Sequence, residues 1–333
     1  MDKKLIILGN GFSRDFLTHI RKDSFVNVGN LFRNGDKVPW PGDDYAGFLS
    51  YKHCPNLWNL GARPNIDDKT GIEIIEDIIT CANIFQKNNR EENNIYIKAY
   101  KELASYLYSL FSYYDKLIDF KKINKQINTW SWSKYLKSLF DDPNISKVYI
   151  LTYNYDVWLE KVLIKKGIPF DISGFEDTDK KFQIFKPHGS ISFIHNVKKV
   201  KDDFKIDYDT DSNDGSISEF TIGYDNIDSL NKINAIIPPA GDSSRLDFKW
   251  AMEIRENAKE VVKELKEDDE LIFCGISYWH VDRYEIDSVL TKISPKISNV
   301  KVFNPNPPRV LNAVMTTLYK NVIFYTDSEC INL

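Results

Sequence analysis

The hydrophobic pattern of the chain alternates between short apolar runs and longer amphipathic segments. Short β-prone runs that end in polar or glycine turns predict buried strands at 4–8, 148–151, 270–274, 300–303 and 322–325. Weaker strand candidates lie at 168–170, 182–185, 191–195 and 220–224. Apolar residues at helical spacing predict helices at 72–85, 95–120, 130–140, 249–266, 284–293 and 309–319, and two more that begin near 12 and 156. Buried strands that alternate with helices predict an α/β fold with a Rossmann-like, doubly wound parallel sheet.

The predicted elements indicate one domain built on a nucleotide-binding core. We expect this core to comprise 1–50 and 146–333, with a helical insertion at 51–145 and a small β-rich excursion at 196–245. A chain of 333 residues is long enough to bury such a core. The irregular segment 24–50 follows the first predicted turn, and such long connections are often lids over functional sites.

Charge and cysteine content narrow the class of protein. A net charge of −4 gives no basic field, so we expect neither direct nucleic-acid binding nor membrane binding. The four cysteines form no C-x-x-C pair, which excludes a structural zinc ribbon on spacing, and few cysteines indicate a reducing compartment. The apolar stretch 5–8 is too short for a signal peptide, and no run approaches the ~18 apolar residues of a membrane span. We therefore expect a cytoplasmic protein without a metal.

Polar turns follow four of the predicted strands, at 9–13, 152–156, 275–277 and 304–306. The carboxyl ends of parallel strands meet at one edge of a sheet, where ligands bind in open α/β folds. We therefore expect these four turns to converge. Asn154, in the polar cluster after the strand at 148–151, is the first candidate for a functional residue.

The first of these turns has the composition of a phosphate-binding turn. Gly9 and Gly11 permit a tight turn between a strand and a helix, and amides at a helix start attract phosphate. Arg14 stands where the third glycine of a dinucleotide fingerprint is expected. A plain strand-to-helix connection stays open as the alternative, with Ser13 as a helix cap.

A second distinctive turn is Lys-Pro-His-Gly-Ser at 186–190. Pro187 and Gly189 on either side of His188 predict a turn that presents the imidazole at a fixed place. The alternative is a structural histidine within a turn. His195 and His280 have no comparable context and are expected to be structural or exposed.

Together the turns resemble the motifs of the sirtuin-like superfamily, in its bacterial NAD-hydrolysing branch. The family's G-A-G-x-S phosphate loop is similar to residues 9–13, with Asn10 where alanine is usual. Its T-x-N-Y-D and K-x-H-G-S motifs are similar to 152–156 and 186–190, and its late G-x-S is similar to 275–277. Asn304 stands at the strand end where the family contacts the adenosine ribose. The start of the chain also resembles the AbiH abortive-infection family.

The resemblance implies an NAD⁺ glycohydrolase, with NAD⁺ as substrate, that releases nicotinamide and ADP-ribose. It assigns catalytic roles to Asn154 and His188. The residues it assigns to NAD⁺ binding are Gly9, Asn10, Gly11, Phe12, Ser13, Thr152, Asp156, Gly275, Ser277 and Asn304. It further implies an anti-phage effector that depletes NAD⁺, controlled by homo-oligomerisation, lid closure or a partner such as a HerA-type ATPase or an Argonaute-like sensor.

The chemistry fits these residue types. An asparagine amide both donates and accepts, so we expect Asn154 to bind a ribose hydroxyl and orient a water. Imidazole exchanges protons near neutral pH, so we expect His188 to act as general base. Asp156 either contacts the ribose or caps the helix that follows it, and the cap is the favoured interpretation.

Two other functions stay open. An NAD-dependent protein deacylase is disfavoured by the lack of the four-cysteine zinc ribbon that protein-deacetylating sirtuins carry. A non-enzymatic sensor of NAD⁺ or ADP-ribose is disfavoured because binding alone requires no general base. An acetyl-peptide assay separates the deacylase from the hydrolase, and turnover separates both from the sensor.

Overall fold

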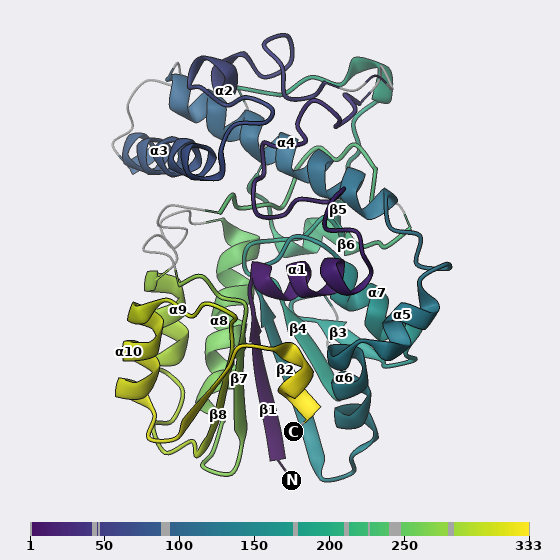
Figure 1. Ribbon diagram of the computed structural model, residues 1–333. Helices are drawn as coiled ribbons and strands as arrows, with labels where there is room; N and C mark the ends of the chain where they lie inside the picture. Colours follow the sequence, from purple (N-terminus) through teal and green to yellow (C-terminus); the bar gives the residue numbers. More distant parts are fainter. Residues whose placement is uncertain are drawn as a thin grey trace. The chain divides into compact units, whose positions relative to one another are not determined.

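The computed structural model describes residues 2–41, 45, 47–87, 94–175, 179–209, 213–225, 227–239, 248–278 and 283–332, with 85–87 in their backbone only (Figure 1). The chain divides into two compact units. Unit 1 comprises Met1–Ser24, Asp119–Pro187 and Ala251–Leu333, and unit 2 comprises Phe25–Ile118 and His188–Trp250. Each unit therefore combines segments that are far apart in the sequence.

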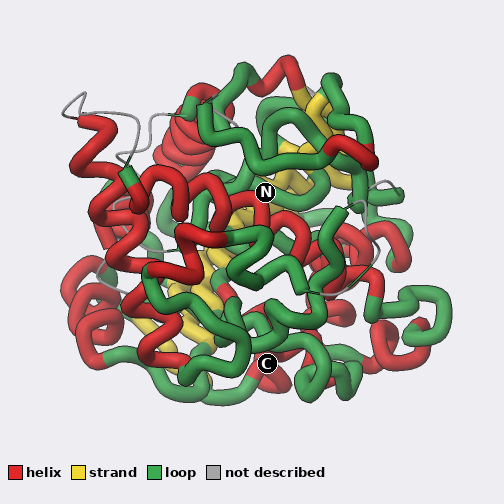
Figure 2. Tube along the Cα trace, turned by 90° about the horizontal axis from the view of Figure 1, so that it is seen from above, coloured by secondary structure: helices red, strands yellow, loops and turns green. Residues whose placement is uncertain are grey.

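Unit 1 is built on a parallel sheet, whose strands are yellow in Figure 2, as are those of the separate two-stranded pair in unit 2. Within the described residues this sheet has seven strands in the order β3-β4-β2-β1-β7-β8-β9, and the pairings between them are parallel. The strands are β1 (Asp2–Leu8), β2 (Ile145–Thr152), β3 (Phe170–Ile172), β4 (Phe182–Phe185), β7 (Glu270–Cys274), β8 (Asn299–Phe303) and β9 (Val322–Tyr325). Strands β2 to β4 lie on one side of β1 and β7 to β9 on the other. Strand order therefore reverses at β1, and such switch points are where α/β sheets bind ligands.

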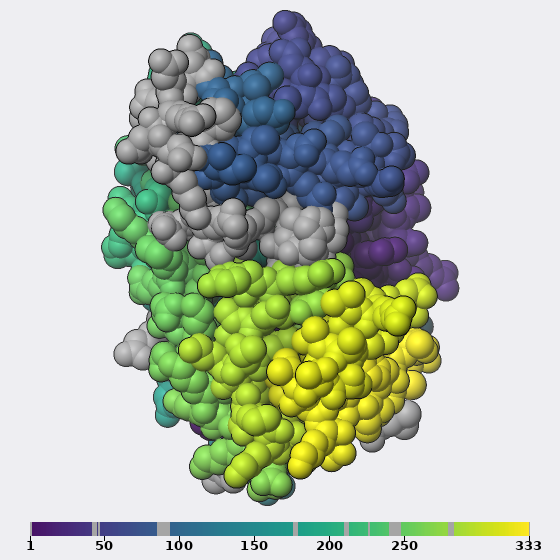
Figure 3. Space-filling model, turned by 90° about the vertical axis from the view of Figure 1, so that its left-hand side faces the viewer, coloured from purple at the N-terminus to yellow at the C-terminus, as the bar shows by residue number. Residues whose placement is uncertain are grey.

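Both faces of this sheet are covered. Successive residues of a strand point to opposite faces, yet Leu5, Ile6 and Ile7 of β1 are each at most 1% exposed. The helices and the short helical turn of unit 1 are α1 (Asn10–His19), α5 (Asn124–Thr129), α6 (Ser131–Asp141), α7 (Trp158–Lys165), α8 (Lys249–Lys263, whose first two residues belong to unit 2), α9 (Arg283–Leu290), α10 (Arg309–Leu318) and η4 (Ser328–Asn332). In Figure 3, the described residues of unit 1 from α8 onward, light green to yellow, lie together on the face in view.

Aromatic side chains join α1 to the start of α6. The Phe12 ring lies 5.2 Å from the rings of both Trp130 and Trp132, and Phe16 lies 5.1 Å from Trp130. The Trp130 indole Nε1 donates a hydrogen bond to Asp15. This packing fixes the helix that follows the glycine turn.

Unit 2 contains α2 (Pro55–Asn59), α3 (Asp68–Lys87) and α4 (Ile95–Lys116), with the antiparallel pair β5 (Phe193–His195) and β6 (Phe220–Ile222) and the short turns η1 (Lys201–Asp203) and η2 (Ile217–Glu219). The described part of 25–50 has no helix or strand, as the sequence predicts. Phe32, Val38 and Phe48 are nevertheless fully buried, and the Tyr106 hydroxyl donates to the Leu31 carbonyl. This segment therefore belongs to the core of unit 2, and its role as a lid stays a prediction.

The fold class predicted from the sequence is confirmed, with small differences at element ends. The helix expected at 95–120 ends at Lys116, and the Asp119 carboxylate accepts the Lys121 amide in a turn that competes with the helix. Helix α6 belongs to unit 1, although the sequence placed it in the helical insertion. The division into one core and two insertions stays a prediction. Among the described residues, no helix is both long and apolar enough to cross a membrane.

Candidate functional site

The four polar turns expected to converge follow strands that end level with one another in unit 1. Leu8 pairs with Thr152 and with Cys274, and Cys274 pairs with Phe303. Hydrogen bonds connect neighbouring strands and turns at this edge: the Tyr153 amide donates to the Leu8 carbonyl, and the Gly275 amide to that of Phe303. The predicted convergence of these turns at the carboxyl edge is therefore confirmed.

The two glycine turns at this edge interlock, backbone against backbone. The Gly9 amide donates to the Cys274 carbonyl, and the Gly11 amide donates to the Gly275 carbonyl at 3.0 Å. A Cβ on Gly11 would lie 2.4 Å from the Gly275 Cα, so neither residue tolerates a side chain. The Gly11 amide and the Phe12 amide, which donates to the Gly9 carbonyl, are both used within the chain. Close packing of the two turns therefore explains why glycine stands at positions 11 and 275, whether or not the turn binds phosphate.

Substitution of Gly275 tests this packing against a matched control. Gly275 has φ +63° and Gly167 has φ +64°, but a Cβ added at Gly167 would meet nothing within 4 Å. Gly167→Ala is expected to cost about 1–2 kcal/mol of unfolding free energy from backbone strain alone. Gly275→Ala is expected to cost about 3–5 kcal/mol, because overpacking adds to that strain. Urea unfolding measures both, and equal losses would contradict the interlocked turns.

Asn154 has its amide nitrogen committed to the protein. Its Nδ2 donates to the Gly9 carbonyl oxygen at 3.0 Å and to Ser13 Oγ at 2.9 Å. A carbonyl oxygen only accepts, so Gly9 fixes the amide with Nδ2 toward α1. Within the described part of the chain, Asn154 Oδ1 accepts no hydrogen bond, and the side chain is half-buried. The sequence predicted an amide that donates and accepts, whereas the structure leaves only the acceptor open.

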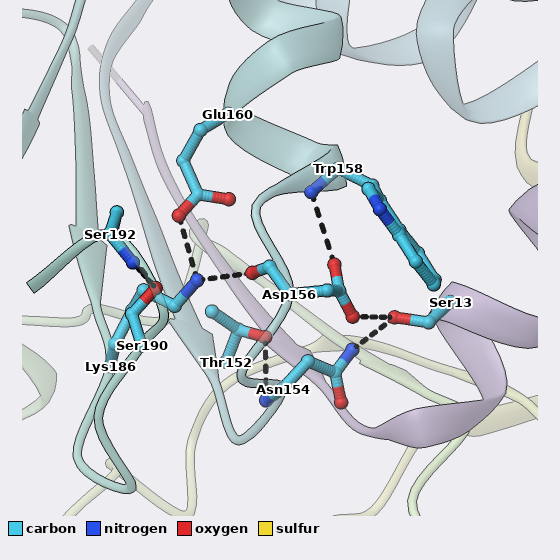
Figure 4. A network of polar contacts seen from close by, with 9 residues as sticks. All are labelled: Ser13, Thr152, Asn154, Asp156, Trp158, Glu160, Lys186, Ser190 and Ser192. Atoms are coloured by element: carbon cyan, nitrogen blue, oxygen red, sulfur yellow. Dashed lines mark hydrogen bonds and ion pairs between the residues drawn. The ribbon is translucent and has the colours of Figure 1, made fainter. Parts of the chain in front are cut away.

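The hydrogen bond between Ser13 and Asp156 determines which group donates and which accepts in the contact of Ser13 with Asn154 (Figure 4). Ser13 Oγ donates to Asp156 Oδ2 at 2.6 Å, and both residues are buried. An ionised carboxylate only accepts, so the Ser13 proton points at Asp156 and its oxygen receives the Asn154 amide. The result is a one-way chain of donors, from Asn154 to Ser13 to Asp156.

Asp156 supports the start of α7 and has a perturbed pKa. Its Oδ1 accepts the amide of Trp158, the first residue of α7, at 3.1 Å. The N-cap position itself belongs to Val157, so Asp156 satisfies a free helix amide from one residue before the cap. Burial raises the pKa of Asp156 to about 6, against the opposing effects of Lys186 and of the Ser13 hydrogen bond. This carboxyl group therefore titrates near neutral pH.

Lys186 and Glu160 are the part of this network that the sequence did not single out. Lys186 Nζ donates to the Asp156 carbonyl oxygen at 2.5 Å and lies 2.7 Å from Glu160 Oε1. Both side chains are 1% exposed. A glutamate inside the apolar run at 157–163 was the available signal, because a buried acid requires a partner.

The remaining predicted NAD⁺-binding residues have mixed surroundings. Thr152 is buried, and its Oγ1 accepts a hydrogen bond from the backbone amide of Asn154 at 3.3 Å. The Asn304 side chain joins two turns, since Nδ2 donates to the Ile276 carbonyl and Oδ1 accepts the Asn306 amide. Asn10 and Ser277 are exposed. Direct NAD⁺ contacts from these residues stay predictions.

His188 belongs to unit 2, two residues beyond Lys186 along the chain. It is buried, and its carbonyl oxygen accepts the Ile237 amide at 3.0 Å. Gly189 has φ +84°, and a Cβ there would lie 1.8 Å from the Ala235 carbonyl oxygen, so the turn requires glycine. The Ser190 and Ser192 hydroxyls that follow lie 2.9 Å apart. The predicted turn around His188 is confirmed, while its catalytic role stays a prediction. His280 lies outside the described residues.

Residues 148–313 match the family model described as the SIR2-like domain. The match includes the Asn154 turn, Lys186, His188 and the turns after β7 and β8, and it leaves out β1 and the first glycine turn. No curated protein matches the chain. Among the residues that the structure describes, no group of three or more His, Cys, Asp or Glu side chains could hold a metal ion.

Proposed function

The chain belongs to the SIR2-like superfamily, whose members are generally NAD-using enzymes, and we propose that it is an NAD⁺ glycohydrolase. In this reaction water replaces nicotinamide at C1′ of the ribose, and the products are nicotinamide and ADP-ribose. SIR2-like domains bind NAD⁺, which supports the choice of substrate.

The observation that carries this proposal is the fixed orientation of Asn154. Its Nδ2 is held by Gly9 and Ser13, and its Oδ1 is the open acceptor at the carboxyl edge of the sheet. Such an acceptor binds a hydroxyl group by its proton, either that of the ribose or that of the attacking water. Because Ser13 and Gly9 fix it before substrate arrives, no reorganisation is required in the reaction.

The bond between C1′ and the pyridinium nitrogen breaks, and its electron pair stays with nicotinamide, which leaves neutral. A water oxygen bonds to C1′, and one proton of that water passes to a base. Asn154 Oδ1 accepts a hydrogen bond from this water or from a ribose hydroxyl, and positive charge on the ribose in the transition state strengthens that contact.

We assign the base to His188 and the pyrophosphate to the start of α1. Imidazole is the side chain best suited to take a proton near neutral pH, and a positioned base contributes about 10²–10⁴-fold in rate. At α1 the helix dipole favours an anion. The amides of Gly11 and Phe12 already donate within the chain, so the dipole and the exposed Asn10 are the features offered to phosphate.

Incubation of the pure protein with NAD⁺ tests the activity. Nicotinamide and ADP-ribose are expected to appear, and His188→Ala is expected to reduce kcat by about 10²–10⁴-fold. An acetyl-lysine peptide is added in a parallel reaction. Nicotinamide release that requires the peptide would identify a deacylase, and ADP-ribose binding without any release would identify a sensor.

We further propose that this activity serves anti-phage defence by NAD⁺ depletion. The support is the similarity of the 9–13, 152–156 and 186–190 motifs to the NAD-hydrolysing defence branch. The protein would then be held inactive until triggered, by self-association or by a HerA-type or Argonaute-like partner. Measurement of cellular NAD⁺ after phage challenge, with His188→Ala as the control, is expected to show depletion only with the wild type.

A further inference from the structure

The ion pair of Lys186 and Glu160 has no assigned part in NAD⁺ chemistry. Both side chains are 1% exposed, so neither is placed to meet solvent. Glu160 Oε2 is buried and accepts no hydrogen bond from any described residue. A buried ion pair with an unsatisfied oxygen contributes little to the stability of the fold, because the cost of desolvating both charges opposes their attraction.

The position of the ion pair indicates that it holds the turn after β2 in place. Lys186 directly follows β4, and its Nζ holds the backbone carbonyl of Asp156 at the end of the 152–156 turn. That turn carries Asn154. The turn after β2 is therefore braced from the end of the neighbouring strand β4, to which β2 is hydrogen-bonded.

The pair also sets the charge around Asp156. Lys186 and Glu160 both act on this carboxylate through their charges: Lys186 lowers the pKa of Asp156 and Glu160 raises it. With all three ionised, two negative charges face one positive charge. The ionised form of Asp156 is the one that orders the donors from Asn154 through Ser13.

We propose that Lys186 and Glu160 are positioning residues, whose buried ion pair holds the Asp156 turn and its charge so that the Asn154 carbonyl oxygen stays aimed at the substrate. This inference rests on the proposed hydrolase activity. Neither residue touches the substrate, and both act through Asp156.

Lys186 and Glu160 act on Asp156 in opposite directions, so removal of each charge in turn tests the inference. Glu160→Gln removes a negative charge beside Asp156 and is expected to move the acid limb of kcat to lower pH. Lys186→Met removes the positive charge and is expected to move it to higher pH, with kcat about 10–100-fold lower and KM changed less than about threefold. Glu270→Gln is the control. Glu270 is also a buried glutamate, and it pairs with Lys4 and Lys301 at the start of β7, the end of the strand away from the site.

A second readout requires no activity. The pH dependence of unfolding stability reports the titration of Asp156 directly, and its midpoint is expected to shift downward in Glu160→Gln and upward in Lys186→Met. Midpoints that do not move, or that move together, would overturn the inference. If the wild type releases no nicotinamide, the proposed function fails, and this readout still decides whether the pair controls Asp156.

A double variant covers the case in which Lys186→Met does not fold. Lys186→Met with Glu160→Leu removes both charges and leaves an apolar pair, an exchange that proteins often tolerate. It is expected to fold and to lose about 10–100-fold in kcat. Wild-type kcat in a folded double variant would overturn the positioning role.

Discussion

Asn154→Ala is expected to reduce kcat for nicotinamide release by about 10²–10³-fold, the typical effect of one preorganised polar group. The substitution removes the open Oδ1 acceptor and also the two hydrogen bonds to Gly9 and Ser13. Loss of these bonds is expected to cost only about 1–2 kcal/mol of unfolding free energy. Chromatographic quantification of nicotinamide, beside a urea unfolding curve, measures both effects.

Two variants show whether the effect belongs to the orientation of Asn154. Asn128→Ala is the matched control, because Asn128 is exposed in α5 and its side-chain oxygen accepts a hydrogen bond from Lys166. It is expected to leave nicotinamide release unchanged. Asn154→Asp keeps the shape but places a second oxygen against the Gly9 carbonyl, so a similar loss is expected. Wild-type release by Asn154→Asp would show that the fixed amide has no role.

Asp156→Asn is expected to lower kcat without lowering the stability of the fold at pH 8. The variant removes a buried negative charge and keeps the side-chain shape, so at pH 8 it is expected to be at least as stable as the wild type. Its amide is able to donate to Ser13, which reverses the direction of the donor chain from Asn154. We therefore expect kcat to fall by about 10–100-fold while KM changes little.

Titration of Asp156 is expected to make the free energy of unfolding depend on pH. The pKa of Asp156 is about 6 in the folded protein against an ordinary value of 3.8, because burial penalises its charge. The folded state therefore holds this proton more tightly than the unfolded chain. Its contribution to stability is complete below about pH 4 and is lost as the pH rises through about 6. A difference of this size corresponds to roughly 3 kcal/mol.

Unfolding free energies measured between pH 4 and pH 8 check this prediction. The wild type is expected to lose about 2–3 kcal/mol more than Asp156→Asn across the range, since other groups titrate equally in both. Asp268→Asn is the control, because Asp268 is exposed. Parallel curves for the wild type and Asp156→Asn would mean that Asp156 does not titrate in this window.

The sequence predicted the elements whose signals are local. The run at 4–8 and the glycine turn after it predict β1 and the start of α1, because apolar strand residues and Gly9 act over short distances. The positive φ of Gly189 follows in the same way from the proline and glycine beside His188. Alignment of the turns after β1, β2, β7 and β8 follows from the parallel pattern of strands and helices.

Contacts that depend on tertiary packing could not be predicted. Lys186 and Glu160 are separated by 26 residues, and no periodicity links them. The direction of the Asn154 amide depends on Gly9, which is 145 residues away. Similarly, the glycines of 9–11 suggest phosphate binding in the sequence, whereas the contact of Gly11 with Gly275 gives them a steric reason that only the folded chain reveals.

We propose the Asn154 turn as the NAD⁺-cleaving site. The most direct test incubates NAD⁺ with the wild type and with Asn154→Ala, each verified as folded, and quantifies nicotinamide and ADP-ribose together. We predict one ADP-ribose for each nicotinamide from the wild type, and a loss of both by at least about 10²-fold in the variant. Intact NAD⁺ after incubation with the wild type under every trigger and assembly state, or equal product from the variant, would contradict the account.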